Sequence, residues 1–178
     1  MIQPDLSKWN ELIEKYDYED GTPIFQRLTQ KSRVAVPDDY DIINMIVLWK
    51  LNRVVHIASE TIEYINAVAN RVQTPSQAIA DPDVRECIRE LVNSRGVRLP
   101  MASTIMHFYA PDAFAIVDER AYRQACGQTL DPAAGWDVYA DYLHACMDLC
   151  LANGIPFRQV DKVLYQLDIE EGNRLGRR

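Results

Sequence analysis

The sequence predicts an all-α fold, and three observations favour it. Apolar residues recur at helical spacing through most of the 178 residues. The nine prolines sit mostly where these periodic segments start or stop, and there are only seven glycines. Strand signals are weak, because Phe114–Val117 is apolar enough for a strand but is short and isolated. We therefore expect a compact, two-lobed helical domain over residues 1–178.

Two helices are expected in the first third of the chain. Asp5–Tyr16 carries apolar residues at helical spacing, with Asp5 as its N-cap, and residues 21–37 form a looser stretch. A second helix is expected to open at Asp38 or Asp39 and to include Ile42–Ile57, which is apolar on nearly every side. Such a pattern is typical of a central, buried helix.

Six further helices are expected in the rest of the chain. Ser59 is the expected cap of the first, and Pro100 suits the first turn of another. Gly127 and Gly154 are placed to end two of them. The expected helices span residues 60–72, 83–92, 100–109, 118 or 119 to 126, 135–152 and 157–167.

Composition excludes several classes of protein. No apolar run approaches the roughly 18 residues of a membrane span, and Met1–Asp5 has neither the basic start nor the apolar core of a secretory signal. Four cysteines in 178 residues do not make a disulfide scaffold, so we expect a cytoplasmic protein. The net charge of -7 argues against coating nucleic acid by bulk charge.

The most informative stretch of the chain is residues 91–126. A helix runs into a tight turn at Gly96–Leu99, and the next helix carries the small pair Ala102–Ser103 one turn in. Gly96 suits a position with positive φ, and Val97 can point inward to pin the turn. After a proline-broken loop, a single acidic residue, Asp118, stands at a helix start.

This arrangement resembles the helix-hairpin-helix DNA glycosylase (HhH-GPD) superfamily. The family hairpin reads roughly L-P-G-V-G-x-K-T-A, and a catalytic aspartate follows about eighteen residues after the lysine, in a V-D-x-x-x-x-R context. The matching positions in this chain are Gly96, Val97, Ala102, Val117, Asp118 and Arg123.

The resemblance implies a helical fold with a helix-hairpin-helix and a monofunctional DNA glycosylase. The hairpin residues Gly96, Val97 and Arg98 would bind a DNA phosphate through their backbone amides. Backbone carbonyl oxygens of the hairpin would be the candidate ligands of a monovalent cation. The damaged or modified base would be flipped into a pocket. Asp118 would stabilise the positive charge that develops on the sugar and orient a water.

Three departures from the family pattern narrow this hypothesis. Pro100 replaces the lysine nucleophile, so a lyase activity through that residue is not expected. Arg98 replaces the second hairpin glycine and puts a side chain where the family uses bare backbone. The cysteines lack the compact spacing of the iron–sulfur members, so no cluster or other cofactor is expected; they are Cys87, Cys126, Cys146 and Cys150.

Simpler interpretations stand beside these. Asp118 also suits an N-cap, a role compatible with catalysis. Cys146 and Cys150 with His144 suggest zinc, but no fourth ligand is evident and we expect no metal. Further candidates for pocket or phosphate contacts are Lys50, Phe108, Tyr109 and Arg123. Packing is the simpler explanation of the two aromatic residues, and a position at the solvent edge of its helix is the simpler explanation of Lys50.

Local charge weakens the objection raised by the acidic total. Residues 85–123 hold six arginines against five acidic residues, whereas residues 1–20 hold two lysines against six acids. We therefore expect a local DNA contact of modest, salt-dependent affinity and no membrane contact. The alternative is a non-catalytic helical module that binds DNA or a protein partner.

Overall fold

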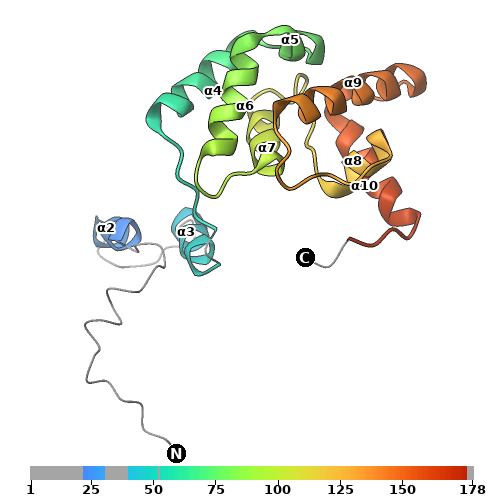
Figure 1. Ribbon diagram of the computed structural model, residues 1–178. Coiled ribbons are helices and arrows are strands. Elements are labelled where there is room, and N and C mark those ends of the chain that lie inside the picture. The colour runs from blue at the N-terminus through green and yellow to red at the C-terminus, as the bar shows by residue number, and fades with distance from the viewer. Residues whose placement is uncertain (1–21, 31–39, 52, 176–178) are drawn as a thin grey trace, which may run out of the picture. The chain divides into compact units, whose positions relative to one another are not determined.

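The computed structural model describes residues 22–30, 40–51 and 53–175 (Figure 1). Within these ranges the elements are helices joined by turns, with no strand, which confirms the all-α fold. The contacts divide the chain into two compact units, residues 1–54 and residues 55–178. The prediction of a single domain over residues 1–178 stays a prediction.

The described part of the first unit consists of two short helices. The helix α2 (Thr22–Gln30) lies in a stretch where no helix was predicted, and α3 (Tyr40–Lys50) ends before the expected Ile57. Ile42 is buried. Other apolar side chains along α3 are exposed, and Leu51, just after the end of the helix, is 62% exposed. The prediction of a central, buried helix is therefore wrong for this segment. Within the described residues of this unit α3 packs on α2, and one short helix shields only one side of another. The predicted helix Asp5–Tyr16 and the predicted start at Asp38 or Asp39 lie outside the described residues.

The second unit contains a helix at each position where the sequence predicted one. The prediction that Ser59 caps the first of these helices is wrong, because the N-cap is Ala58 and no side chain caps the helix. A helix at Pro75–Ala80 was not predicted, although Thr74 caps it by accepting a hydrogen bond from the Gln77 N–H. The elements are α4 (Ser59–Arg71), α5 (Pro75–Ala80), α6 (Pro82–Asn93), α7 (Leu99–Tyr109), α8 (Glu119–Cys126), α9 (Trp136–Asn153), a 3-10 turn (Phe157–Gln159) and α10 (Val160–Glu170).

The helices of the second unit pack in two groups that share one core. The helices α4, α6 and α7 contact one another, α8 lies against α9 and α10, and α6 contacts α9 between the groups (Figure 1). The largest fully buried side chains come from both groups and include Ile88, Leu91, Met106, Phe114, Tyr139, Tyr142 and Leu143. Burying such side chains is the main stabilising contribution to the fold.

No helix in the described ranges is long and apolar enough to cross a membrane. The longest described helix, α9, has 18 residues, and charged and polar side chains alternate along it with apolar ones.

Candidate functional site

The turn between α6 and α7 is held by backbone hydrogen bonds. The Val97 N–H donates to Ser94 O at 3.1 Å, and the Val97 side chain is buried. The His56 N–H donates to Arg95 O at 3.1 Å, which ties the chain before α4 to this turn. Gly96 has a φ of 82°, in the left-handed region. The position of Val97 and the positive φ therefore agree with what was expected of these two residues.

Arg98 is the N-cap residue of α7, but its side chain does not cap the N–H groups of the first turn. Arg98 is exposed, and α7 has no side-chain cap. A helix N-terminus carries unpaired N–H groups and partial positive charge, so it favours anions. Pro100, in the first turn, has no N–H to contribute.

Gly96 offers a direct test of the turn. We expect Gly96→Val to lower the free energy of unfolding by about 1–2 kcal/mol, because a β-branched residue is strained at positive φ. Gly96→Asn is the matched control, since asparagine tolerates this region, and it should retain most of the stability. Urea denaturation of the full chain measures both; equal losses in the two variants would contradict the assignment of strain.

The segment that leads to Asp118, residues 114–117, is not helical and is almost completely buried. Its backbone is bonded residue by residue to core side chains, and this was not predicted. His107 Nδ1–H donates to Phe114 O at 2.7 Å, and the Val117 N–H donates to Ser103 Oγ at 3.1 Å. The hydroxyls of Tyr139 and Tyr142 donate to the carbonyl oxygens of Ala115 and Ile116, each at 2.8 Å. Four anchors from α7 and α9 thus fix the backbone that presents Asp118, as a pre-organised site requires.

Asp118 is the N-cap of α8. Its Oδ1 accepts a hydrogen bond from the Ala121 N–H at 2.8 Å, and the Arg120 N–H also bonds to the carboxylate. A carboxylate has about four lone-pair sites, so these two contacts leave capacity for a water or a substrate. The predicted cap is confirmed, and the side chain remains partly exposed.

The environment of Asp118 raises its pKa above the ordinary value. Burial is the largest cause, and the negative charge of Asp161 adds to it. The two backbone hydrogen bonds and the charge of Arg120 act in the opposite direction. A partly buried carboxyl group with a raised pKa is more basic than a surface aspartate, and such groups concentrate at functional sites.

Arg123 lies on the same helix but is engaged by Asp168 of α10. Its Nε and Nη2 lie 2.8 and 2.7 Å from the two oxygens of Asp168, and Arg120 Nη1 lies 2.8 Å from one of them. Asp168 is 0% exposed, and the Arg123 hydrogen bond is the main cause that holds its pKa far below the ordinary value. This cluster joins α8 to α10. A phosphate contact by Arg123 stays a prediction.

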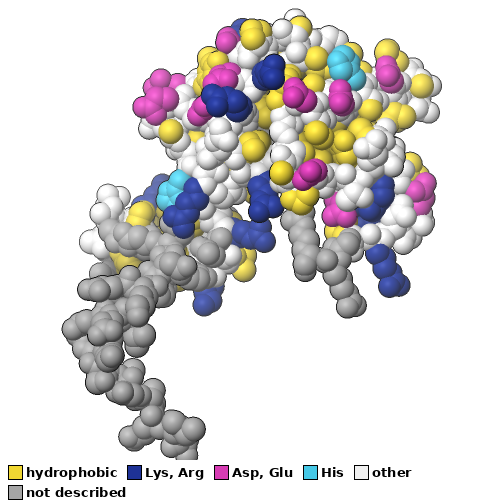
Figure 2. All heavy atoms as spheres, viewed as in Figure 1, with side chains coloured by type: hydrophobic (Ala, Val, Ile, Leu, Met, Phe, Trp, Pro, Cys, Tyr) yellow, Lys and Arg dark blue, Asp and Glu magenta, His cyan; other side chains and the backbone are white. Residues whose placement is uncertain are grey.

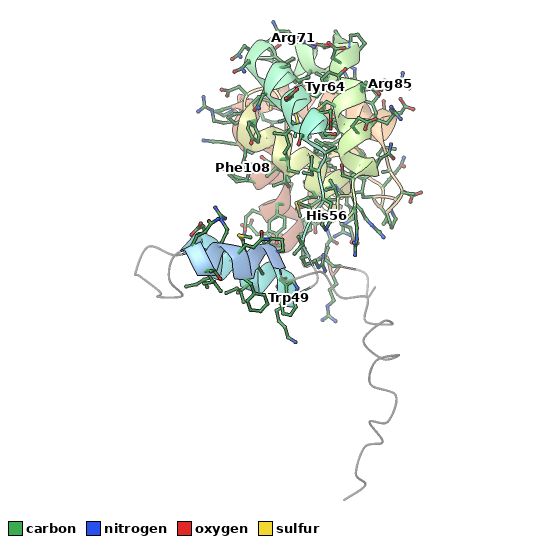
Figure 3. All side chains as sticks on the ribbon, turned by 90° about the vertical axis from the view of Figure 1, so that its left-hand side faces the viewer. Trp49, His56, Tyr64, Arg71, Arg85 and Phe108 are labelled. Atoms are coloured by element: carbon green, nitrogen blue, oxygen red, sulfur yellow. The ribbon has the colours of Figure 1, made fainter. Side chains whose placement is uncertain are left out.

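The remaining candidates lie on the surface. Phe108 and Tyr109, at the end of α7, are 78% and 55% exposed, and Phe108 lies at the edge of the second unit in Figure 3. Lys50 is exposed at the end of α3, in the first unit. Asp118 therefore caps α8 and Arg123 lies on that helix, whereas the turn residues and the aromatic pair lie at opposite ends of α7.

Asp161 and Asp168 were missed by the sequence analysis. Both are buried on α10, on the face that also buries Val160 and Leu164. Acidic residues on the apolar face of an amphipathic helix were a usable signal, because a buried carboxylate needs partners.

The described residues contain no group of three or more His, Cys, Asp or Glu side chains arranged to hold a metal. Cys146 is buried and its pKa is raised to about 12, mainly by burial, so its thiol stays protonated at neutral pH. His144 is exposed on the same helix.

Comparisons with protein families, with curated proteins and with solved structures found no match for this chain. The interpretation of its function therefore depends on residues 91–126 and on the surroundings of Asp118.

Proposed function

We propose that this protein is a monofunctional DNA glycosylase with Asp118 as its catalytic carboxylate. The observation that carries the proposal is the presentation of Asp118: a rigid, buried segment ends at a partly exposed carboxylate whose pKa is raised by burial. This carboxylate follows a Gly-Val turn at the family spacing.

The chemistry that suits Asp118 is hydrolysis of an N-glycosidic bond. When the bond between sugar C1′ and the base nitrogen breaks, its electron pair leaves with the base and positive charge develops on the sugar. A nearby carboxylate stabilises that charge, more strongly in a partly desolvated site than in water. Water then bonds to C1′, its proton passes to the carboxylate and on to solvent, and the departing base takes up a proton from solvent. The base must first leave the duplex, because its glycosidic bond is not accessible within the stack.

The DNA backbone would be bound at the turn between α6 and α7. Arg98 and the open N-terminus of α7 supply the charge and N–H groups that bind a phosphate. On the face of residues 55–178 seen in Figure 2, basic and acidic side chains are interspersed rather than gathered in one basic patch. The expected contact is therefore local, with modest affinity.

A phosphate contact at this turn predicts a specific loss of DNA affinity in the variant Arg98→Ala. We expect weaker binding of every duplex and a reduction of about 1 in the slope of log K against log salt, because one phosphate contact is removed. Fluorescence anisotropy with a labelled duplex between about 50 and 200 mM salt measures the slope. The matched control is Lys162→Ala, an exposed cation on α10; an equal loss in both variants would contradict a contact at the turn.

A second candidate function is a non-catalytic module that binds DNA. Pro100 favours it, since the proline removes one N–H from the turn that would bind phosphate and supplies no nucleophile. A panel of duplexes with alkylated, oxidised or deaminated bases separates the two functions. Release of any base supports the glycosylase, whereas binding without release supports the module.

A further inference from the structure

The hydroxyl of Ser103 connects the start of α7 to the segment that presents Asp118. It donates to Pro100 O at 2.9 Å, and it accepts a hydrogen bond from the Val117 N–H at 3.1 Å. Pro100 lies in the first turn of α7, shortly after Arg98. Val117 immediately precedes Asp118. One side chain therefore links the two parts of the proposed site, the turn that would bind a DNA phosphate and the proposed catalytic carboxylate.

The hydrogen-bonding capacity of the Ser103 hydroxyl fits these two partners. Ser103 is 0% exposed, so the hydroxyl is enclosed by the protein. A serine hydroxyl has one proton to donate and lone pairs to accept. The proton goes to Pro100 O, which leaves the lone pairs for the Val117 N–H. Donation also makes the oxygen a better acceptor, because hydrogen bonds in a chain polarise one another. A buried hydroxyl with both roles filled does not reach substrate, so Ser103 would act through its neighbours.

The other three anchors of this segment come from different parts of the fold. Two are tyrosines of α9, and the third, His107, lies in the last turn of α7. All three bind carbonyl oxygens of residues 114–116. Among the four anchors, the Ser103 hydrogen bond is the nearest to Asp118 along the chain, and it comes from the part of α7 that follows the turn. Ser103 therefore sets the position of Asp118 relative to that turn.

Base excision would depend on this relative position. A duplex held by its backbone at the turn presents a flipped nucleotide at a place fixed by that contact. The carboxylate must then lie close to the sugar on which positive charge develops. A misplacement of about 1 Å can lower a rate on the order of 100-fold.

We propose that Ser103 is a positioning residue, which holds the Asp118 carboxylate at the place required by a duplex bound at the turn between α6 and α7. The effect on base excision rests on the proposed function. The hydrogen-bonded link does not, and it is tested separately.

Thr104 provides a matched control for the variant Ser103→Ala. Its Oγ1 donates to the same Pro100 O, at 2.8 Å, and this hydrogen bond stays within α7. Thr104→Val keeps the shape of the side chain and removes only that bond. Ser103→Ala instead removes the acceptor of the Val117 N–H.

The first test is hydrogen exchange of the Val117 amide, followed by NMR in the full chain. In Ser103→Ala this amide should exchange about 10-fold faster relative to the amides of α6, the factor that corresponds to one lost hydrogen bond. Thr104→Val should leave that ratio unchanged. An unprotected Val117 amide in the wild type, an unchanged ratio in Ser103→Ala, or equal acceleration in both variants would contradict the link. The first of these outcomes needs no variant, so it does not depend on whether a variant folds.

The second test is a carboxyl-carbon NMR titration of Asp118 in the same three proteins. Burial is the largest cause of its raised pKa, so a carboxylate that is no longer held in place should titrate at lower pH. The midpoint should therefore fall in Ser103→Ala and stay in place in Thr104→Val. An unchanged or higher midpoint in Ser103→Ala would show that Ser103 does not control the position of the carboxylate.

Excision provides the third test. Ser103→Ala should lower kcat on the order of 10-fold with little change in KM, because misplacing a reacting group slows chemistry more than binding. Thr104→Val should match the wild type. A rise in KM alone, or an equal loss in the control, would contradict positioning. If the wild-type protein releases no base, the proposed function fails, while the hydrogen exchange and the titration still decide whether Ser103 positions Asp118.

Discussion

The variant Asp118→Asn should lose base excision by about 10²- to 10⁴-fold while its fold stays intact. Asparagine caps helices about as well as aspartate, so the hydrogen bond to the Ala121 N–H is retained. In the proposed reaction, the variant would lack the negative charge that stabilises the cationic sugar. Single-turnover excision on the best duplex of the lesion panel measures the effect. Undiminished excision would remove Asp118 from the catalytic role.

The effect of Asp118→Asn on the stability of the protein also has an expected direction. The pKa of Asp118 is raised in the folded protein, so its ionised form is less favourable in the fold than in the unfolded chain. That unfavourable contribution is present above the folded pKa and disappears as pH falls through it. Asp118→Asn should therefore unfold at the same or a higher urea concentration than the wild type at pH 7.

Asp81 provides the matched control, because it is also an N-cap aspartate. Its pKa is lowered, chiefly by the hydrogen bond from Arg71, whose Nε lies 2.8 Å from Oδ2. Asp81→Asn removes a favourable charge and should destabilise the protein at pH 7 without affecting base release. Loss of excision in both variants would indicate a general effect of altered helix caps.

The variant Asp168→Asn should have the largest effect on stability, a loss of about 3 kcal/mol, the lower end of the range for breaking a buried ion pair. The carboxylate is buried, and its two arginine partners, on α8, lose their counter-charge in the variant. The lower end applies because both guanidinium groups retain some exposure to solvent. Urea denaturation at pH 7 measures this loss.

The contribution of Asp168 should depend on pH in the opposite way to that of Asp118. Its pKa is lowered in the fold, so its stabilisation is complete above the unfolded pKa and is lost as pH falls toward the folded value. The difference between wild type and Asp168→Asn should therefore shrink below about pH 4, the pKa of an unperturbed aspartate. The control is Asp112→Asn, which removes an exposed pair with Arg158 and should change stability much less. Equal effects of the two substitutions would contradict a structural role for the Asp168 cluster.

Local patterns in the sequence predicted most helices of residues 55–178 because caps, glycines and apolar spacing act over a few residues. The ends of α8 and α9 follow from Gly127 and Gly154, both at positive φ. The same rules failed at α3, where a run that is apolar on every side resembles a buried helix. How much of such a run is covered depends on what packs against it, which the run itself does not contain.

The candidate site was predictable in part. The number of residues between Gly96 and Asp118 can be read from the sequence, and so can the suitability of Asp118 as an N-cap. The four anchors of the segment before Asp118 were not predictable, because they join residues up to 26 positions apart through side chains that look like ordinary core residues.

The sequence by itself determined that this chain is helical and that one aspartate follows the Gly-Val turn at a helix start, since both depend on neighbours along the chain. Only the tertiary structure decided the chemistry of that aspartate. Its pKa depends on burial and on Asp161, which is 43 positions away in the chain and comes near Asp118 only when α10 packs on α8. Electrostatic and desolvation effects act through space, and the distances that control them exist only in the folded protein.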